Sequence, residues 1–361
     1  MNAGLRVRVS RFALALVVGL FSATVVAKEN GPLVTAPAFQ LEKIVPGSEF
    51  HSLNGIALGP DGKVYVASVT GESVYTFDLT TRKIDILVGP PLGQSDDLVI
   101  TREGAVIWTS IAEGIVRRRD PDGRIRDIAK DLPGANSIAL SADGGQLFVG
   151  QVFLGDGLWE LDPEGERPPR RIAADIGGLN AFALGGDGMI YGPLFFKHSL
   201  VRVDPANGNV VTLASGFEHP ASARFDAEGR LFVLDSAPGI LYQVDVATGE
   251  KRKVAQLATV ADNMTMLPDG RILVSNLVNS SIEEVNPDTG SVRTLVSGKL
   301  TFPRDIAIAK DDPQDRLYIA DSVALRALDR GSSEPREMAR FLASELHPDS
   351  GISISDRHIV L

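Results

Sequence analysis

One pattern recurs along the chain about every 42 residues. Each unit has a polar residue, an alternating apolar run, a turn rich in Asp and Gly, and a second alternating run, as in NGIALGPDGKVYVAS from Asn54 onward. A fixed period in this range is typical of β-propellers and solenoids. The polar residues that open the units are Asn54, Asp97, Asn136, Asn180, Ser222, Asn263 and Asp305.

The second half of each unit has the chemistry of a β-hairpin. Two short alternating runs flank an Asp-Pro or Gly-containing turn, as in SLVRVDPANGNVVTLA (199–214) and ILYQVDVATGEKRKVAQ (240–256). No stretch with helical periodicity is long enough to connect parallel strands. The sequence therefore predicts an all-β fold, a β-propeller with four-stranded antiparallel blades.

The number of blades depends on how the ring closes. Seven units are complete, and residues 335–345 supply either a short helix or the outer strand of the seventh. Residues 40–45 match an outer strand, and residues 351–361 match the first two strands of a further unit. We therefore expect a composite closing blade, eight blades in all, because shared strands would fasten the two ends. A plain seven-bladed ring is the alternative.

The N-terminus has the features of a secretory signal peptide over residues 1–27. A basic region precedes an apolar stretch at residues 12–26, and Val25 and Ala27 are the small residues that signal peptidase recognises. We expect a periplasmic or secreted protein whose mature chain, residues 28–361, is one propeller domain. An uncleaved membrane anchor is the alternative.

Composition narrows the choice of partners. The chain carries a net charge of −10 and loses three arginines with the signal peptide, so the mature surface is more acidic still. Such a surface disfavours nucleic acids and anionic membranes. The absence of cysteine excludes disulfides and thiolate metal sites. A small organic molecule, such as a lactone or ester, is the expected ligand, and a protein partner is the alternative.

Several units resemble the propellers related to gluconolactonase and regucalcin, to paraoxonase, to strictosidine synthase and to NHL-repeat proteins. The resemblance is carried by NGIALGPDGKVYVAS, NSIALSADGGQLFVGQ, ADNMTMLPDGRILVSN and DRLYIADS. It implies a Ca²⁺ ion on the propeller axis, with Asn136 and the Asp262-Asn263 pair among its ligands. The sequence departs from the family pattern at Asn54, where gluconolactonases have a glutamate, and at Ser222.

The polar residues that open the units give a second argument for a cation. They converge at one mouth of the channel in a propeller, and a hard cation prefers several such oxygens. The alternative is that Asn, Asp and Ser cap the preceding turns. We predict Ca²⁺, with Mg²⁺ as the alternative, and ligands from Asp97, Asn136, Asn180, Asp262 and Asn263. Asn54 and Asp305 are predicted to contact the organic ligand.

Loops on the same face supply candidates for catalysis and binding. His51, His198 and His219 lie in loops that open beside the polar ring, and a histidine is the usual general base near neutral pH. Phe153, Phe195 and Phe196 lie in neighbouring loops and are suited to line a pocket for an organic ligand.

These features favour an exported, metal-dependent hydrolase of lactone or ester type. Two alternatives remain: a non-catalytic propeller that binds a ligand or protein, and a carbon–oxygen lyase resembling the streptogramin-inactivating propellers. Sequence signatures of serine hydrolases, P-loop nucleotide-binding proteins and zinc proteases are absent.

Overall fold

The computed structural model describes residues 53–69, 71–78, 80–81, 83–267, 269–279, 281–297, 303–308, 316–321, 324–329, 335–340, 353–355 and 358–360. Their regular elements are β-strands. Within these ranges no helix has the length and apolar character needed to cross a bilayer. The predicted signal peptide and His51 lie outside the described residues, and export stays a prediction.

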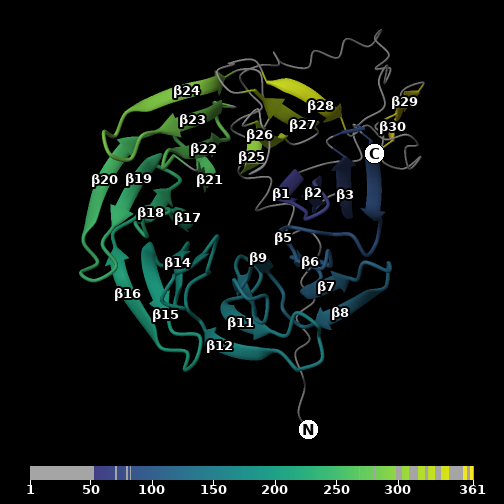
Figure 1. Ribbon diagram of the computed structural model, residues 1–361, viewed down its shortest axis with the longest axis horizontal. Helices are drawn as coiled ribbons and strands as arrows, with labels where there is room; N and C mark the ends of the chain where they lie inside the picture. The colour runs from purple at the N-terminus through teal and green to yellow at the C-terminus, as the bar shows by residue number, and fades with distance from the viewer. Residues whose placement is uncertain are drawn as a thin grey trace. The chain divides into compact units, whose positions relative to one another are not determined.

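Seven four-stranded antiparallel sheets follow one another along the chain as the blades of a ring (Figure 1). In each blade the strands run in sequence order from the inner edge to the outer edge. The first four blades are β1 (Leu53–Leu58), β2 (Lys63–Ser68), β3 (Ser73–Asp78), β4 (Ile84–Val88); β5 (Leu98–Ile100), β6 (Val106–Ser110), β7 (Ile115–Arg119), β8 (Ile125–Ala129); β9 (Ala135–Leu140), β10 (Leu147–Gln151), β11 (Gly157–Leu161), β12 (Arg170–Ala174); and β13 (Ala183–Leu184), β14 (Ile190–Leu194), β15 (Ser199–Val203), β16 (Val210–Ser215).

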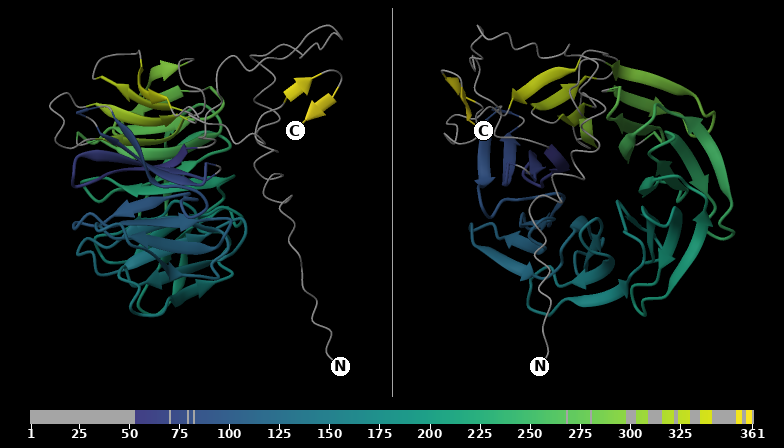
Figure 2. Two further views of the ribbon diagram at one scale, coloured as in Figure 1. Left: turned by 90° about the vertical axis from the view of Figure 1, so that its right-hand side faces the viewer. Right: turned by 180° about the vertical axis from the view of Figure 1, so that it is seen from behind.

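The remaining three blades have the same arrangement, and Figure 2 shows the ring from the side and from behind, with the inner strands around its axis. The seventh blade takes residues 336–340 as its outer strand, which decides between the two expectations for that segment. These blades are β17 (Pro220–Phe225), β18 (Leu231–Asp235), β19 (Ile240–Val244), β20 (Lys251–Gln256); β21 (Ala261–Met266), β22 (Ile272–Asn276), β23 (Ser281–Val285), β24 (Val292–Ser297); and β25 (Pro303–Ile308), β26 (Leu317–Asp321), β27 (Ala324–Leu328), β28 (Arg336–Arg340).

A separate hairpin, β29 (Ser353–Ser355) with β30 (His358–Val360), pairs Ile354 with Ile359. It belongs to a different compact unit from the ring, which lies within residues 46–345.

The ring is held together by apolar packing between neighbouring blades. Seven core clusters exist among the described residues, and each contains side chains from two adjacent blades. Successive residues of β2 face opposite ways: Val64 and Val66 pack toward the seventh blade, and Tyr65 and Ala67 pack toward the second. Because a strand alternates its side chains, a strand apolar on both faces serves two interfaces.

The ring closes by direct contact of the seventh blade with the first. Tyr318, Leu325 and Met338 form one core cluster with Tyr75 and other residues of the first blade. The seven complete units are confirmed, and the seven-bladed alternative is the correct count. The expected composite eighth blade is wrong for this ring, because the apolar faces it would separate already pack on each other. Residues 40–45, its proposed outer strand, lie outside the described residues.

A polar contact reinforces the closure. The Asp305 Oδ2 atom accepts a hydrogen bond from the backbone N–H of Ile56 at 3.1 Å, and Oδ1 accepts one from Ile306 N at 2.9 Å. Burial, with a further contribution from the Asp97 carboxylate, raises the pKa of Asp305 to about 7. The link between the two ends of the ring therefore depends on a titratable group.

We expect this group to make the fold weaken as the pH rises from about 4 to about 7. In this range Asp305 ionises in the unfolded chain before it ionises in the folded one, so each rise in pH favours unfolding. The free energy of unfolding of the wild type minus that of Asp305→Asn should fall through this range and then level off. Urea denaturation at a series of pH values measures it, and a constant or growing difference would contradict the assignment.

Candidate functional site

The polar residues that open the inner strands occupy two different registers. Strand pairing puts Ile56, opposite Val66, at the same place in its blade as Ala223, opposite Val233. Ile56 lies two residues after the opener Asn54, whereas Ala223 lies one residue after the opener Ser222. The first register holds Asn54, Asp96, Asn136, Asn180 and Asp262; the second holds Asp97, Ser222, Asn263 and Asp305. The predicted single ring of openers is therefore wrong.

A sequence signal for the correct alignment was present in the turn that follows. Asn54 and Asp96 each precede the turn glycine, Gly62 or Gly104, by the same number of residues, whereas Asp97 is one residue closer. Both glycines have positive φ, 75° and 87°, so the turn requires them at this place. The glycine is therefore a better marker of register than the polar residue.

Second-register side chains connect neighbouring inner strands. Asp97 accepts hydrogen bonds from Leu98 N at 2.8 Å and from Ile138 N of the next blade at 3.3 Å. Asn263 Oδ1 accepts from Met264 N and from the Ser222 hydroxyl of the preceding blade. Burial raises the pKa of Asp97 to about 6. These oxygens hold backbone and side-chain donors, so Asp97 and Asn263 have a structural role in linking neighbouring inner strands.

The first register contains a buried oxygen that has no hydrogen-bond partner. Asn54 Nδ2 donates to Asp96 Oδ1 at 2.7 Å, which leaves Asn54 Oδ1 buried without a partner. Asn136, Asn180 and Asp262 lie at the same register in other blades, and Asn136 Oδ1 accepts a hydrogen bond from the Ser137 hydroxyl at 3.0 Å. Within the described ranges no three His, Asp or Glu side chains cluster as a metal site. Any cation here would therefore depend on asparagine oxygens.

The predicted aromatic and histidine residues come together in one cluster. The mouth cluster consists of Phe153, Phe195, Phe196, His198 and His219, from loops on the face where the inner strands begin. Ring centroids lie 5.6 Å apart for Phe153–Phe195, 5.3 Å for Phe195–His219 and 5.7 Å for His198–His219. Phe153 and Phe196 are 40% and 54% exposed, so the cluster presents an apolar surface beside two imidazoles.

Backbone hydrogen bonds and a close backbone contact hold the phenylalanine side of the mouth cluster. The Asp156 carboxylate accepts hydrogen bonds from the backbone N–H groups of Gly177 and Gly178 at 2.8–3.0 Å. A Cβ on Gly178 would lie 2.7 Å from the Phe196 ring, and its φ of +76° also requires glycine. The backbone at Gly178 therefore lies close against the Phe196 ring and limits the movement of that ring.

A buried carboxylate holds the histidine side. Asp235 is 2% exposed and accepts hydrogen bonds from Glu218 N at 2.8 Å and His219 N at 2.7 Å. His198 Nδ1 lies 2.6 Å from the Glu218 carbonyl oxygen. Because a carbonyl only accepts, the neutral ring must carry its proton on Nδ1, which leaves the lone pair on Nε2. His198 is exposed, so this basic atom is available to a substrate.

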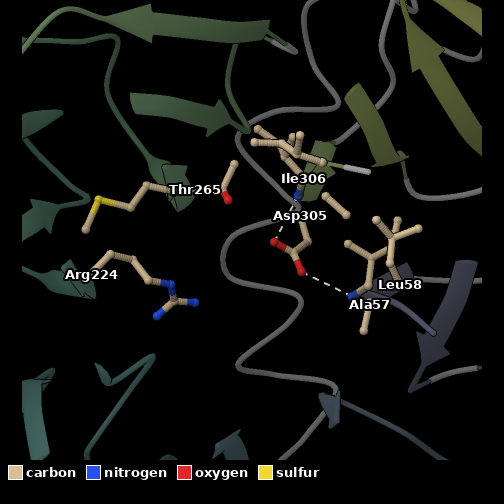
Figure 3. Close-up of a pocket in the computed structure, with 10 residues that line it drawn as sticks. Ala57, Leu58, Arg224, Thr265, Asp305 and Ile306 are labelled. Carbon is tan, nitrogen blue, oxygen red and sulfur yellow. Dashed lines mark hydrogen bonds between the residues drawn. The ribbon is translucent and has the colours of Figure 1, made fainter. Parts of the chain in front are cut away.

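A second feature lies among the inner strands of the first, fifth, sixth and seventh blades. A cavity of about 280 Å³ is lined by Arg224, Asp305, Thr265 and apolar side chains (Figure 3). Arg224 extends from one side toward Asp305 on the other. Sequence reasoning missed Arg224, because it lies two residues after the opener Ser222, on a strand that otherwise looks ordinary.

Comparison with models of known protein families finds no match. A gluconolactonase of Zymomonas mobilis is 31% identical over 141 residues, which span 34% of this chain and 38% of that protein. Because the match covers well under two thirds of this gluconolactonase, it does not show that the present chain has the same activity.

Solved structures share the ring. A streptogramin B lyase has a TM-score of 0.66 at 16% identity and covers 79% of this chain and 93% of its own. The virginiamycin B lyase of Staphylococcus aureus gives 0.64 at 13%, covering 79% and 94%, and the hydrazine synthase of Kuenenia stuttgartiensis gives 0.64 at 14%, covering 83% and 100%. At these identities the likeness shows the fold alone.

The chain resembles the gluconolactonase/NHL-type propellers in part of its sequence and in its ring. The sequence match and the seven-bladed ring support this together, as the repeat phrases predicted. This resemblance leaves the chemistry of the propeller open, since one fold carries many functions.

The support under His219 can be tested in this propeller. Asp235→Ala leaves two partly buried N–H donors unpaired, and we expect a loss of about 2–4 kcal/mol in the free energy of unfolding. Asp245→Ala is the matched control: its carboxylate accepts two N–H groups of an exposed turn in the same blade, so we expect a loss below about 1 kcal/mol. Equal losses in urea denaturation would contradict this role for Asp235.

Proposed function

We propose that the chain is a hydrolase of lactone or ester type that acts at the mouth cluster. The observation that carries the proposal is His198, whose Nδ1 is bonded to a carbonyl oxygen and whose Nε2 is a base beside an exposed aromatic surface. The match to a gluconolactonase supports the reaction class. The aromatic surface suits a neutral organic substrate, because an uncharged ring or chain loses little hydration there.

In the proposed reaction, His198 Nε2 removes a proton from a water molecule, and the water oxygen attacks the substrate carbonyl carbon. The carbon–oxygen bond to the leaving alkoxide then breaks, and the imidazolium returns the proton to that oxygen. A lactone is opened to a hydroxycarboxylic acid. Phe153 and Phe196 hold the apolar part of the substrate, and Asp235 fixes the loop that carries His219.

Replacing His198 tests the base. We expect His198→Asn to lower kcat/KM on a lactone panel by about a hundredfold or more, the usual contribution of a general base. Asn tolerates the positive φ of 54° at this position, so the loop should keep its path. Lys197→Ala, a neighbouring exposed side chain, is the control and should keep its activity.

The product mass separates the rival functions. A hydrolase adds one water to the substrate, whereas a lyase leaves the summed mass of the products unchanged. Retention of activity in His198→Asn would overturn the assignment of the base. Wild-type protein that turns over no lactone or ester would favour the non-catalytic binding function instead.

We also propose that a calcium ion supports this reaction, held by first-register oxygens from Asn54, Asn136, Asn180 and Asp262. The buried, unpartnered Asn54 Oδ1 supports this choice. When bound, such an ion would polarise a carbonyl oxygen as a Lewis acid.

Calcium dependence has a structural readout. Ca²⁺ should raise the Tm of EDTA-treated wild type, because a ligand that binds the folded chain stabilises it, and Asn136→Ala should reduce the shift. Asn209→Ala, in an exposed turn of the fourth blade, is the control and should keep it. A Tm that does not respond to Ca²⁺ or EDTA would contradict the proposal.

A further inference from the structure

We propose that the cavity lined by Arg224 and Asp305, the channel cavity, is a binding site for a small organic carboxylate. Arg224 is the residue that recognises the charge of this ligand. The site is separate from the mouth cluster, because none of the residues that line it belongs to that cluster. The proposal does not require hydrolase activity, although a hydroxy acid released from a lactone would be a ligand of this class.

The state of Arg224 is the first argument. Its Nη1 donates to the carbonyl oxygens of Phe182 at 3.3 Å and Ala223 at 3.0 Å, which fixes the guanidinium at the cavity wall. Among the described residues no carboxylate lies within ion-pair distance of it. Nε and Nη2 remain as donors in the fork that matches a carboxylate. The charge of Arg224 opposes the rise in the pKa of Asp97 and Asp305 without an ion pair to either, and a ligand carboxylate would contact the half-buried guanidinium directly.

The opposite wall provides a complementary group. Asp305 faces the cavity, and its two oxygens hold the backbone N–H groups of Ile56 and Ile306. Since burial raises its pKa to about 7, this carboxyl is protonated in part of the molecules near neutral pH and can donate its O–H to a ligand. Thr265 adds a hydroxyl to the lining.

The remaining lining limits the size and shape of the ligand. The accessible lining is mostly polar, with a small apolar part from residues such as Met264, Ile306, Ile308 and Leu58, and the volume is about 280 Å³. This is at the small end of the range for ligand sites, which favours short carboxylates over large organic molecules. A short chain with one carboxylate and one hydroxyl, such as lactate or 3-hydroxybutyrate, matches one cation, one hydroxyl and a mostly polar lining.

The test is calorimetric titration of the full-length protein with sodium lactate, 3-hydroxybutyrate and acetate, and with lactamide and sodium chloride as neutral and ionic controls. We expect at least one carboxylate to bind and lactamide not to bind. Arg224→Gln should weaken binding by about ten- to a hundredfold, the value of a charge-assisted pair. Arg252→Gln, on the outer strand of the same blade, changes the net charge equally and should bind as the wild type does.

Further variants keep the outcome clear. If Arg224→Gln does not fold, Arg224→Lys retains the charge without the fork and should weaken binding by a smaller factor. His198→Asn should bind the carboxylate as the wild type does, so loss of catalysis and loss of this site are distinguishable. Absence of binding up to about 10 mM for every acid, or equal affinity in Arg224→Gln and wild type, would overturn the proposal.

Discussion

The structure depends on apolar packing between blades that are hydrophobic on both faces. A four-stranded sheet with two apolar faces is not stable alone in water, and it must cover both faces with neighbours. Seven clusters between adjacent blades satisfy this requirement, including the one between the last blade and the first. Closure therefore follows from the same contact as every other interface, and it needs no strand shared between the two ends.

The inner strands of the closed ring must also find hydrogen-bond acceptors for backbone N–H groups. Inner strands have an edge with no further strand to pair with, so backbone N–H groups there need other acceptors. Asp97 and Asp305 accept from the neighbouring strand, and their burial raises both pKa values. Polarity at the start of the repeats thus has a structural cause in the second register.

The two proposed sites differ in charge in a way that agrees with the proposed chemistry. The mouth cluster is aromatic, with imidazoles as its only ionisable members, and suits a neutral substrate. The channel cavity presents a guanidinium without an ion-pair partner among the described residues and suits an anion. The carboxylates of Asp235, which is buried, and Asp156, which is half-buried, position the mouth loops, because a charge-assisted hydrogen bond to a backbone N–H allows little movement.

The sequence by itself determined the all-β class, the four strands of each blade and the mouth loops with Phe153, Phe195, Phe196, His198 and His219. These follow from local patterns: alternation, turn chemistry and a period near 42 residues. Tertiary structure alone decided the seven-bladed closure, the hydrogen bonds between neighbouring inner strands, and the exposure of Arg224 to a cavity. Those depend on which faces meet across the ring, and contacts between residues as distant as Ile56 and Asp305 leave no local signal in the sequence.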